Sequence, residues 1–144
     1  MRGFIDLHSH WVAGIDDGAR TTADSVALLT ALREAGFDTV CATPHMRPGM
    51  FENTASDLRA AYEATRAAIE GAQGLPALLL GSEHFFDDIV FQRLMDGAGL
   101  PYPGGRAALV ELPTRGFPAR LEHRFSDLRR QRIRPVLAHP ERYE

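Results

Sequence analysis

The sequence predicts an α/β protein with about five parallel strands and flanking helices. Short apolar runs alternate with longer segments of helical periodicity, which is the pattern of βαβ units. No internal repeat, low-complexity tract or Pro/Ser-rich linker interrupts this alternation, so residues 1–144 are predicted to form one domain. The apolar content of 44% and the charged content of 24% are typical of a chain that buries a hydrophobic core.

The predicted strands are short, apolar and bounded by turn residues. They cover residues 4–8, 39–42, 77–81, 107–112 and 135–138. The first predicted helix covers residues 23–35, with Thr22 as its N-cap and Gly36 just past its end. Its apolar stripe of Val26, Leu29 and Leu32 is expected to face the core.

Three further helices are predicted between the remaining strands. One begins at Asn53 or Thr54, stops at Gly71 and buries Leu58, Tyr62 and Ile69. The next covers residues 87–96, opening on two carboxylates that suit a helix N-terminus. The last covers residues 119–131 and faces the core with Leu121, Phe125 and Leu128.

Charge and cysteine content exclude several classes of protein. A net charge of −3 provides no general attraction for nucleic acid or for an anionic membrane, so neither is an expected partner. All 16 basic residues are arginines, and we expect no single face to collect them. Cys41 is the only cysteine, which excludes an internal disulfide, and no N-terminal signal or membrane segment is recognised, so the expected location is the cytoplasm.

The first predicted strand carries a His-x-His pattern. Its two-residue period places Asp6, His8 and His10 on one face, with Ile5 and Leu7 on the other. Taken alone, two histidines on a strand are weak evidence of a metal site, because surface or buried histidines are common without one.

The other strands add one metal-capable side chain each, at or just past the C-terminal end. These residues are His45, Glu83, Glu111 and His139. In a (β/α) barrel the C-terminal ends of the strands meet at the active-site face, so we expect the side chains to converge. Mixed imidazole and carboxylate ligands suit Zn, Mn or Fe, and such sites commonly hydrolyse phosphate esters.

Four motifs resemble those of a known family. They are Asp6-Leu7-His8-Ser9-His10, Gly14-Ile15-Asp16-Asp17-Gly18, Ala42-Thr43-Pro44-His45 and Leu137-Ala138-His139-Pro140-Glu141-Arg142-Tyr143. In this order they resemble the bacterial metal-dependent tyrosine phosphatases of the polymerase and histidinol phosphatase (PHP) superfamily. The resemblance implies a distorted (β/α) barrel and the hydrolysis of phosphotyrosine in proteins, linked to capsule or exopolysaccharide synthesis, with a bacterial tyrosine kinase as the expected partner and substrate.

The resemblance also implies a site for up to three ions, usually manganese, although Fe or Zn would also suit the ligands. The implied ligand sets are His8, His10 and Glu83 for one ion; Glu83, Glu111 and His139 for a second; and Asp17 with His45 for a third. Arg142 would bind the substrate phosphate, which suits the fork geometry of a guanidinium. Asp6 would orient His8 or His10 through a hydrogen bond. Hydrolysis would use metal-activated water, without a covalent phosphoenzyme.

Members of this family continue beyond the point that corresponds to Glu144. Their later strands supply an Asp-x-His pair and usually another arginine, which this sequence does not contain. We therefore expect a chain that lacks its C-terminal portion, with a barrel left open along its first and last strands. Only the set of Glu83, Glu111 and His139 would then be complete.

Cys41 and Arg47 have the Cys-x5-Arg spacing of cysteine-dependent tyrosine phosphatases, which suggests a rival mechanism. We expect Cys41 to be a buried strand residue instead, and Pro44 removes a backbone donor that a phosphate loop would need. Two more hypotheses are a different PHP reaction, such as histidinol phosphate hydrolysis, and a catalytically inactive remnant of the enzyme.

Several conspicuous residues receive weaker predictions. His84 is expected to be structural, and His123 is expected to face solvent. Arg47 and Arg115 follow predicted strands within reach of an anionic substrate, but we expect them to be solvated loop residues. Trp11 and Phe86 either line the mouth of the site or simply pack.

Overall fold

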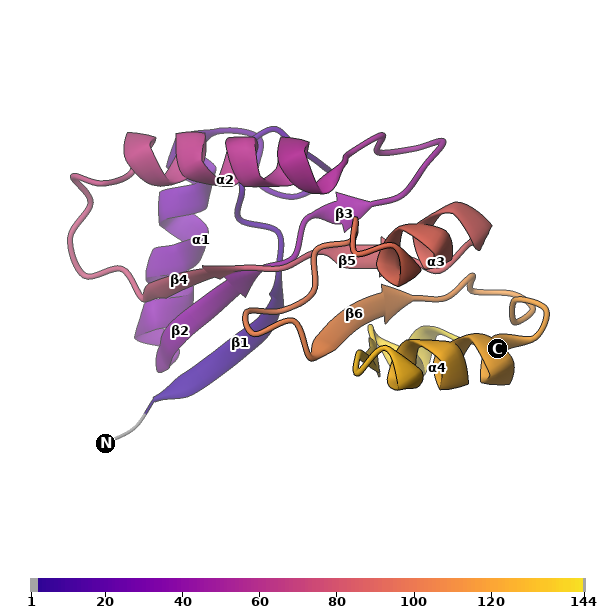
Figure 1. Ribbon diagram of the computed structural model, residues 1–144. Helices are drawn as coiled ribbons and strands as arrows, with labels where there is room; N and C mark the ends of the chain where they lie inside the picture. Colours follow the sequence, from indigo (N-terminus) through magenta and orange to yellow (C-terminus); the bar gives the residue numbers. More distant parts are fainter. Residues whose placement is uncertain (1–2, 144) are drawn as a thin grey trace.

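The computed structural model describes residues 3–143 and forms two parallel sheets with flanking helices (Figure 1). The first sheet has the strand order β1-β2-β4, and the second has the order β3-β5-β6-β7. The strands are β1 (Phe4–Ser9), β2 (Phe37–Ala42), β3 (His45–Met46), β4 (Ala77–Leu80), β5 (Glu83–Phe85), β6 (Ala107–Glu111) and β7 (Arg134–Leu137). The predicted α/β class with parallel strands is confirmed. The strand number differs, because residues 3–143 form seven strands in two sheets instead of the predicted five.

Two predicted strands each continue into a second, very short strand of the other sheet. Thr43 and Pro44 separate β2 from β3, and Gly81 and Ser82 separate β4 from β5. Proline has no N–H for a ladder, so the regular pairing stops there. The Ser82 hydroxyl donates to the Pro44 carbonyl at 2.8 Å, which holds the two crossing points together. These crossings place His45 and Glu83 at the start of paired strands.

The α-helices of the described part of the chain are α1 (Thr22–Glu34), α2 (Ala55–Ala68), α3 (Asp88–Met95) and α4 (Leu121–Arg130), followed by the 3-10 turn η1 (Pro140–Arg142). Thr21, not Thr22, is the N-cap of α1, because Thr21 has an extended backbone and its side chain accepts from the Asp24 N–H. Thr54 caps α2 in the same way, which selects one of the two predicted start positions. Asp87 caps α3.

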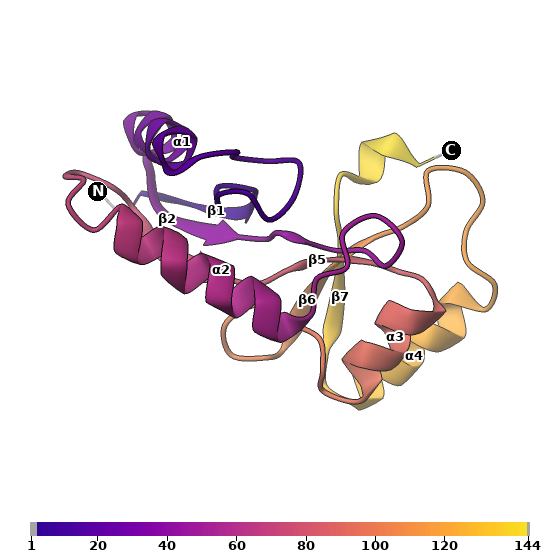
Figure 2. The ribbon, with the colours of Figure 1, turned by 90° about the horizontal axis from the view of Figure 1, so that it is seen from above.

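Separate core clusters lie under the two sheets. Leu29 of α1 and Tyr62 of α2 pack with Val40 of β2 in the first cluster. Leu128 of α4 packs with Val110 of β6 in the second. Figure 2 shows α3 and α4 side by side next to the second sheet, whereas α1 and α2 accompany the first. The predicted apolar faces of the helices are therefore confirmed.

The strands β1 and β7 lie at the outer edges of their sheets. Among residues 3–143 each of them pairs with one neighbouring strand, so the edge strands expected from the sequence are present. Apolar side chains on both strands are exposed, with Ile5 at 59% and Leu137 at 40%. Within that range, none of the helices has the length and apolarity needed to cross a membrane.

Candidate metal centre

One cavity of about 400 Å³ gathers the predicted site residues. Its lining includes all seven predicted ligands and also Arg142. It is lined by His8, His10, Asp17, His45, Arg47, Met50, Phe51, Glu83, Glu111, His139 and Arg142. These residues come from strands, strand ends and loops that are far apart in the sequence. The predicted convergence at the strand ends is confirmed as geometry.

Glu83 lies at the centre of this cavity and is only 1% exposed. Its Oε2 lies 3.0 Å from His8 Nε2 and 3.2 Å from His10 Nε2. Its Oε1 lies 2.9 Å from His139 Nε2. Burial opposes ionisation, but the hydrogen bonds with His10 and His8 outweigh it and hold the pKa of this carboxyl far below its usual value. Glu83 is therefore a carboxylate with both oxygens directed at imidazoles.

His45 connects Glu83 to two further carboxylates. Its Nδ1 lies 3.5 Å from Glu83 and 3.8 Å from Glu111, and its Nε2 lies 3.5 Å from Asp17. The ring stacks on Phe51 with an interplanar angle of 8°. Asn53 fixes the backbone, donating to the carbonyls of His45 and Ile15.

Asp16 orients two of the predicted ligands, a role that the sequence did not reveal. Its Oδ2 accepts from His10 Nδ1 at 2.8 Å and from the His45 N–H at 3.0 Å. Burial lowers the pKa of His10, but the hydrogen bonds to Asp16 and Glu83 outweigh it and raise that pKa to about 9. The two carboxylates thus attract positive charge to the position of His10.

Asp6 makes a different contact from the predicted one. Its Oδ1 accepts from the backbone N–H of His8 at 3.1 Å, so it bonds to the peptide and not to an imidazole ring. The ring-orienting hydrogen bond predicted for Asp6 is made by Asp16 to His10. Side chains on alternate residues of a strand share a face, but that does not decide which of their atoms meet.

Two arginines border the cavity. Arg142 lies on η1 and lines the cavity, where the sequence places it. His139, the residue before η1, has a positive φ of 28°. Arg47 was predicted to be a solvated loop residue, and this is wrong. Its guanidinium lies 3.7 Å from Glu111 and stacks over the Phe85 ring at 4.1 Å. Neither contact was visible in the sequence, because both partners belong to distant strands.

The donor atoms fit divalent metal ions. Ligand atoms of three residue groups lie within 4.8 Å of one another: His8, His10 and Glu83; His10, Asp17 and His45; and His45, Glu83 and Glu111. Buried His45 Nδ1, Glu111 Oε2 and His139 Nδ1 have no hydrogen-bond partner among the described residues. Because unpaired buried polar atoms are costly, unsatisfied atoms beside a cavity are consistent with a role as metal ligands. In this geometry His45, rather than His139, groups with Glu83 and Glu111.

The other conspicuous residues of the sequence lie outside this cavity, either packed in the core or exposed on the surface. Trp11 and Phe86 are fully buried, so they pack in the core and do not line the mouth. His84 is fully buried, with Nδ1 bonded to the Leu109 carbonyl and Nε2 accepting from the Leu100 N–H. Burial lowers its pKa to about 4. His123 is exposed, as expected. Arg115 is exposed and does not line the cavity.

Cys41 does not lie in a phosphate loop. It is fully buried within β2, and burial raises the pKa of its thiol to about 12. A thiol of that pKa is protonated at neutral pH and is a poor nucleophile. The geometry therefore contradicts the cysteine-dependent rival.

Residues 4–144 match the model of the family described as capsular polysaccharide synthesis, CpsB/CapC. Among characterised proteins, the chain is similar to the tyrosine-protein phosphatase YwqE of Bacillus subtilis, with 34% identity over 140 residues. That alignment covers 96% of this chain and 54% of YwqE. The tyrosine-protein phosphatase CpsB of Streptococcus pneumoniae is 28% identical, with 97% of this chain and 58% of CpsB covered.

A solved structure shares the fold with a TM-score of 0.88 and 31% identity, covering 97% of this chain and 57% of the other. It belongs to a study of YwqE from Bacillus subtilis and CpsB from Streptococcus pneumoniae, described as unique metal-dependent tyrosine phosphatases. This chain spans a little over half the length of these relatives.

Proposed function

The chain belongs to the CpsB/CapC family of capsular polysaccharide synthesis, and we propose that it hydrolyses phosphotyrosine in proteins at a metal-dependent site. The observation that carries this proposal is the position of Glu83. One buried carboxylate contacts imidazoles from β1, from the loop after β1 and from the end of β7. A bridging carboxylate with histidines on both oxygens suits a multinuclear centre, and relatives named as tyrosine phosphatases support the reaction.

The proposed ligands are the seven predicted residues. They are His8, His10, Asp17, His45, Glu83, Glu111 and His139. Bound divalent ions would supply positive charge that acidifies water and neutralises phosphate oxygens. Manganese is the proposed metal, following the family resemblance.

The chain's own residues would position the substrate and the ligands. Arg142 would bind the phosphate group through its planar fork of N–H donors. Arg47, stacked on Phe85 and near Glu111, would offer a second guanidinium at the cavity. Asp16 would keep the Nδ1 proton on His10, which leaves Nε2 free to ligate. Phe51 and Met50 are apolar residues of the cavity lining and would limit the entry of water.

The biological setting is also part of the proposal. A phosphorylated tyrosine kinase is the proposed protein substrate, in the regulation of capsule or exopolysaccharide synthesis. The family description supports the link to capsular polysaccharide synthesis, and the names of the relatives support a phosphotyrosine protein as substrate. The kinase itself is proposed from the family resemblance alone.

We also propose that the two sheets are consecutive arcs of a distorted (β/α) barrel. All ladder pairings between the described strands are parallel, and the chain passes directly from one sheet to the other at two places. Both features support barrel curvature.

A substrate panel tests the proposed reaction. The chain, reconstituted with manganese, should hydrolyse a phosphotyrosine peptide faster than histidinol phosphate or a small alkyl phosphate. Glu83→Gln should lose turnover and bound metal, whereas Glu63→Gln, on the exposed surface of α2, should keep both. Circular dichroism of each variant should show the helix content of the unmodified chain, as a control for folding. Preference for histidinol phosphate would favour the other PHP reaction, and bound metal without turnover of any substrate would favour an inactive remnant.

A further inference from the structure

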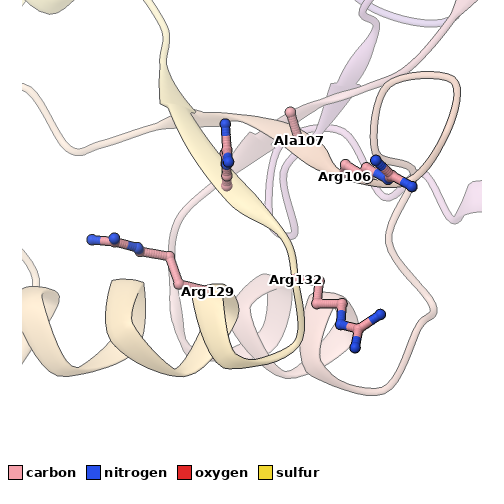
Figure 3. A pocket seen from close by; sticks show the side chains of 5 residues that line it. Arg106, Ala107, Arg129 and Arg132 are labelled. Carbon is pink, nitrogen blue, oxygen red and sulfur yellow. The ribbon is translucent and has the colours of Figure 1, made fainter.

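A second concavity lies at the opposite end of the β6–β7 pair from the metal centre. It has a volume of about 680 Å³ and is lined by Arg106, Ala107, Arg129, Arg132 and Arg134. Arg129 extends from α4, Arg132 from the turn after it and Arg106 from the loop before β6, each in a different direction (Figure 3). The sequence did not predict that four of the sixteen arginines would share one concavity, because only chain folding brings residues 106, 129, 132 and 134 together.

These four arginines differ from the paired arginines elsewhere. None of their guanidinium groups has a hydrogen bond or ion pair with any residue in the range 3–143. By contrast, the structure contains the ion pairs Arg33–Asp38, Arg47–Glu111, Arg66–Glu63, Arg124–Asp88 and Arg130–Asp127. Within the described range no carboxylate lines the concavity, although the whole chain has a net charge of −3. Four positive charges are thus concentrated without neutralisation.

Arg132 occupies a backbone position that is normally given to glycine. Its φ is 62°, in the left-handed region, where a side chain with a Cβ is strained. Such outliers are a reason to look for function at a residue. Arg129, at the end of α4, is also explained by the helix dipole. The dipole explains neither Arg106 at the edge of β6 nor the strained Arg132.

The backbone holds this group in place. The Arg134 N–H donates to the Arg106 carbonyl at 2.9 Å, and Arg134 pairs with Ala107 in the β6–β7 ladder. At roughly 3.3 Å per residue, the two ends of β6 are about 13 Å apart. Glu111 of the metal centre lies at the far end of that strand, so the arginine concavity is a separate site.

We propose that this concavity binds a compact, multiply charged phosphate chain, of the pyrophosphate or tripolyphosphate class. Guanidinium forks match phosphate oxygens, and several negative charges would relieve the mutual repulsion of the arginines. Among the described residues, Ala107 is the only lining residue other than arginine, so no aromatic ring is present to stack on a base. The phosphate chain itself, free or as the tail of a nucleotide, is what the site recognises.

Calorimetric titration of the full chain with tripolyphosphate at low salt tests this proposal. Arg132→Gly removes a charge and also relieves the strained φ, so the variant should fold well. Combining it with Arg134→Gln should weaken tripolyphosphate binding about tenfold or more, because charge-assisted contacts are lost. Arg59→Gln, on exposed α2, is the matched control for lost charge. Arg142→Gln removes a cation from the catalytic cavity and should leave this binding unchanged.

A parallel titration with a nucleoside triphosphate distinguishes the two sources of the ligand. Equal affinities for tripolyphosphate and the nucleoside triphosphate would show that the free phosphate chain is sufficient. Tighter binding of the nucleoside triphosphate would show that the ligand is the phosphate tail of a nucleotide. Both results support phosphate binding in the arginine concavity. Unchanged affinity in the Arg132→Gly/Arg134→Gln variant overturns the proposal. Loss of binding in Arg142→Gln would place the ligand in the catalytic cavity and would also overturn it, as would the absence of binding to the unmodified chain.

Discussion

Asp16 accepts a hydrogen bond from His10 Nδ1 at 2.8 Å, and the same oxygen accepts from the backbone N–H of His45. One carboxylate therefore fixes a ring on the loop after β1 and the peptide at the start of β3. Asp16 precedes Asp17, which lines the cavity itself. The two neighbouring carboxylates thus have different tasks, one supporting the ligands and one available as a ligand.

Asp16→Asn should weaken metal binding about 10- to 100-fold, the usual effect of removing a partner that orients a ligating histidine. The neutral amide removes the negative charge beside His10 Nδ1, and its nitrogen cannot accept a hydrogen bond, so at least one of the three N–H partners of Asp16 also loses its acceptor. Metal affinity measured by competition with a chromogenic chelator checks this. Asp6→Asn is the matched control, because an amide oxygen can still accept from the His8 N–H. A larger loss in Asp6→Asn than in Asp16→Asn would contradict the assignment.

Arg47→Gln should lower kcat/KM for a phosphotyrosine peptide about 10- to 100-fold, since one charge-assisted contact is worth about 1.5–3 kcal/mol. The bound metal should be unchanged, because arginine does not ligate metal. Steady-state kinetics and metal analysis measure the two quantities. Arg115→Gln, outside the cavity, should leave both as they are. Equal kcat/KM values for Arg47→Gln and Arg115→Gln would contradict a role of Arg47 in substrate binding.

Cys41 should react slowly with thiol reagents at pH 8 in the folded chain, because its pKa is raised to about 12 by burial. Reaction with a chromogenic disulfide should become fast only in denaturant. Cys41→Ser should keep its phosphatase activity. Rapid labelling of the folded chain, together with loss of turnover, would restore the cysteine mechanism.

Thr21→Ala should lower the free energy of unfolding by about 1 kcal/mol, the typical cost of losing an N-cap side chain. Thr22→Ala is the matched control, because Thr22 lies one residue inside α1 and the cap hydrogen bond is made by Thr21. Urea unfolding of both variants measures the difference. A cost at Thr22 equal to or greater than that at Thr21 would contradict the capping geometry.

Much of the fold could be predicted because periodicity is a local property. The stripe containing Leu29 and the alternation along β1 follow from spacing alone. The strands β3 and β5 could not be found in this way, because segments of two and three residues have no measurable period. They exist because β2 and β4 run on past Pro44 and Gly81 into the second sheet.

The candidate site was predictable where a ligand follows an apolar strand, as His139 follows β7. The roles of residues were not predictable where contacts between distant segments determine which side chains meet. Asp16 and Asp17 are adjacent in sequence, and only the fold shows which one bonds to His10. Arg47 enters the cavity because Phe85, a residue of a different strand, supports its guanidinium. Trp11 follows the His-x-His segment directly, yet it is buried against Tyr62.

The most direct test of the account is phosphotyrosine hydrolysis by the full chain after removal of metal and after its return. Turnover should disappear in excess chelator and should return when manganese is added to the dialysed protein. Glu83→Gln should stay inactive under both conditions, since its carboxylate joins the histidines of the proposed centre. Full activity of the unmodified chain in excess chelator would contradict the account.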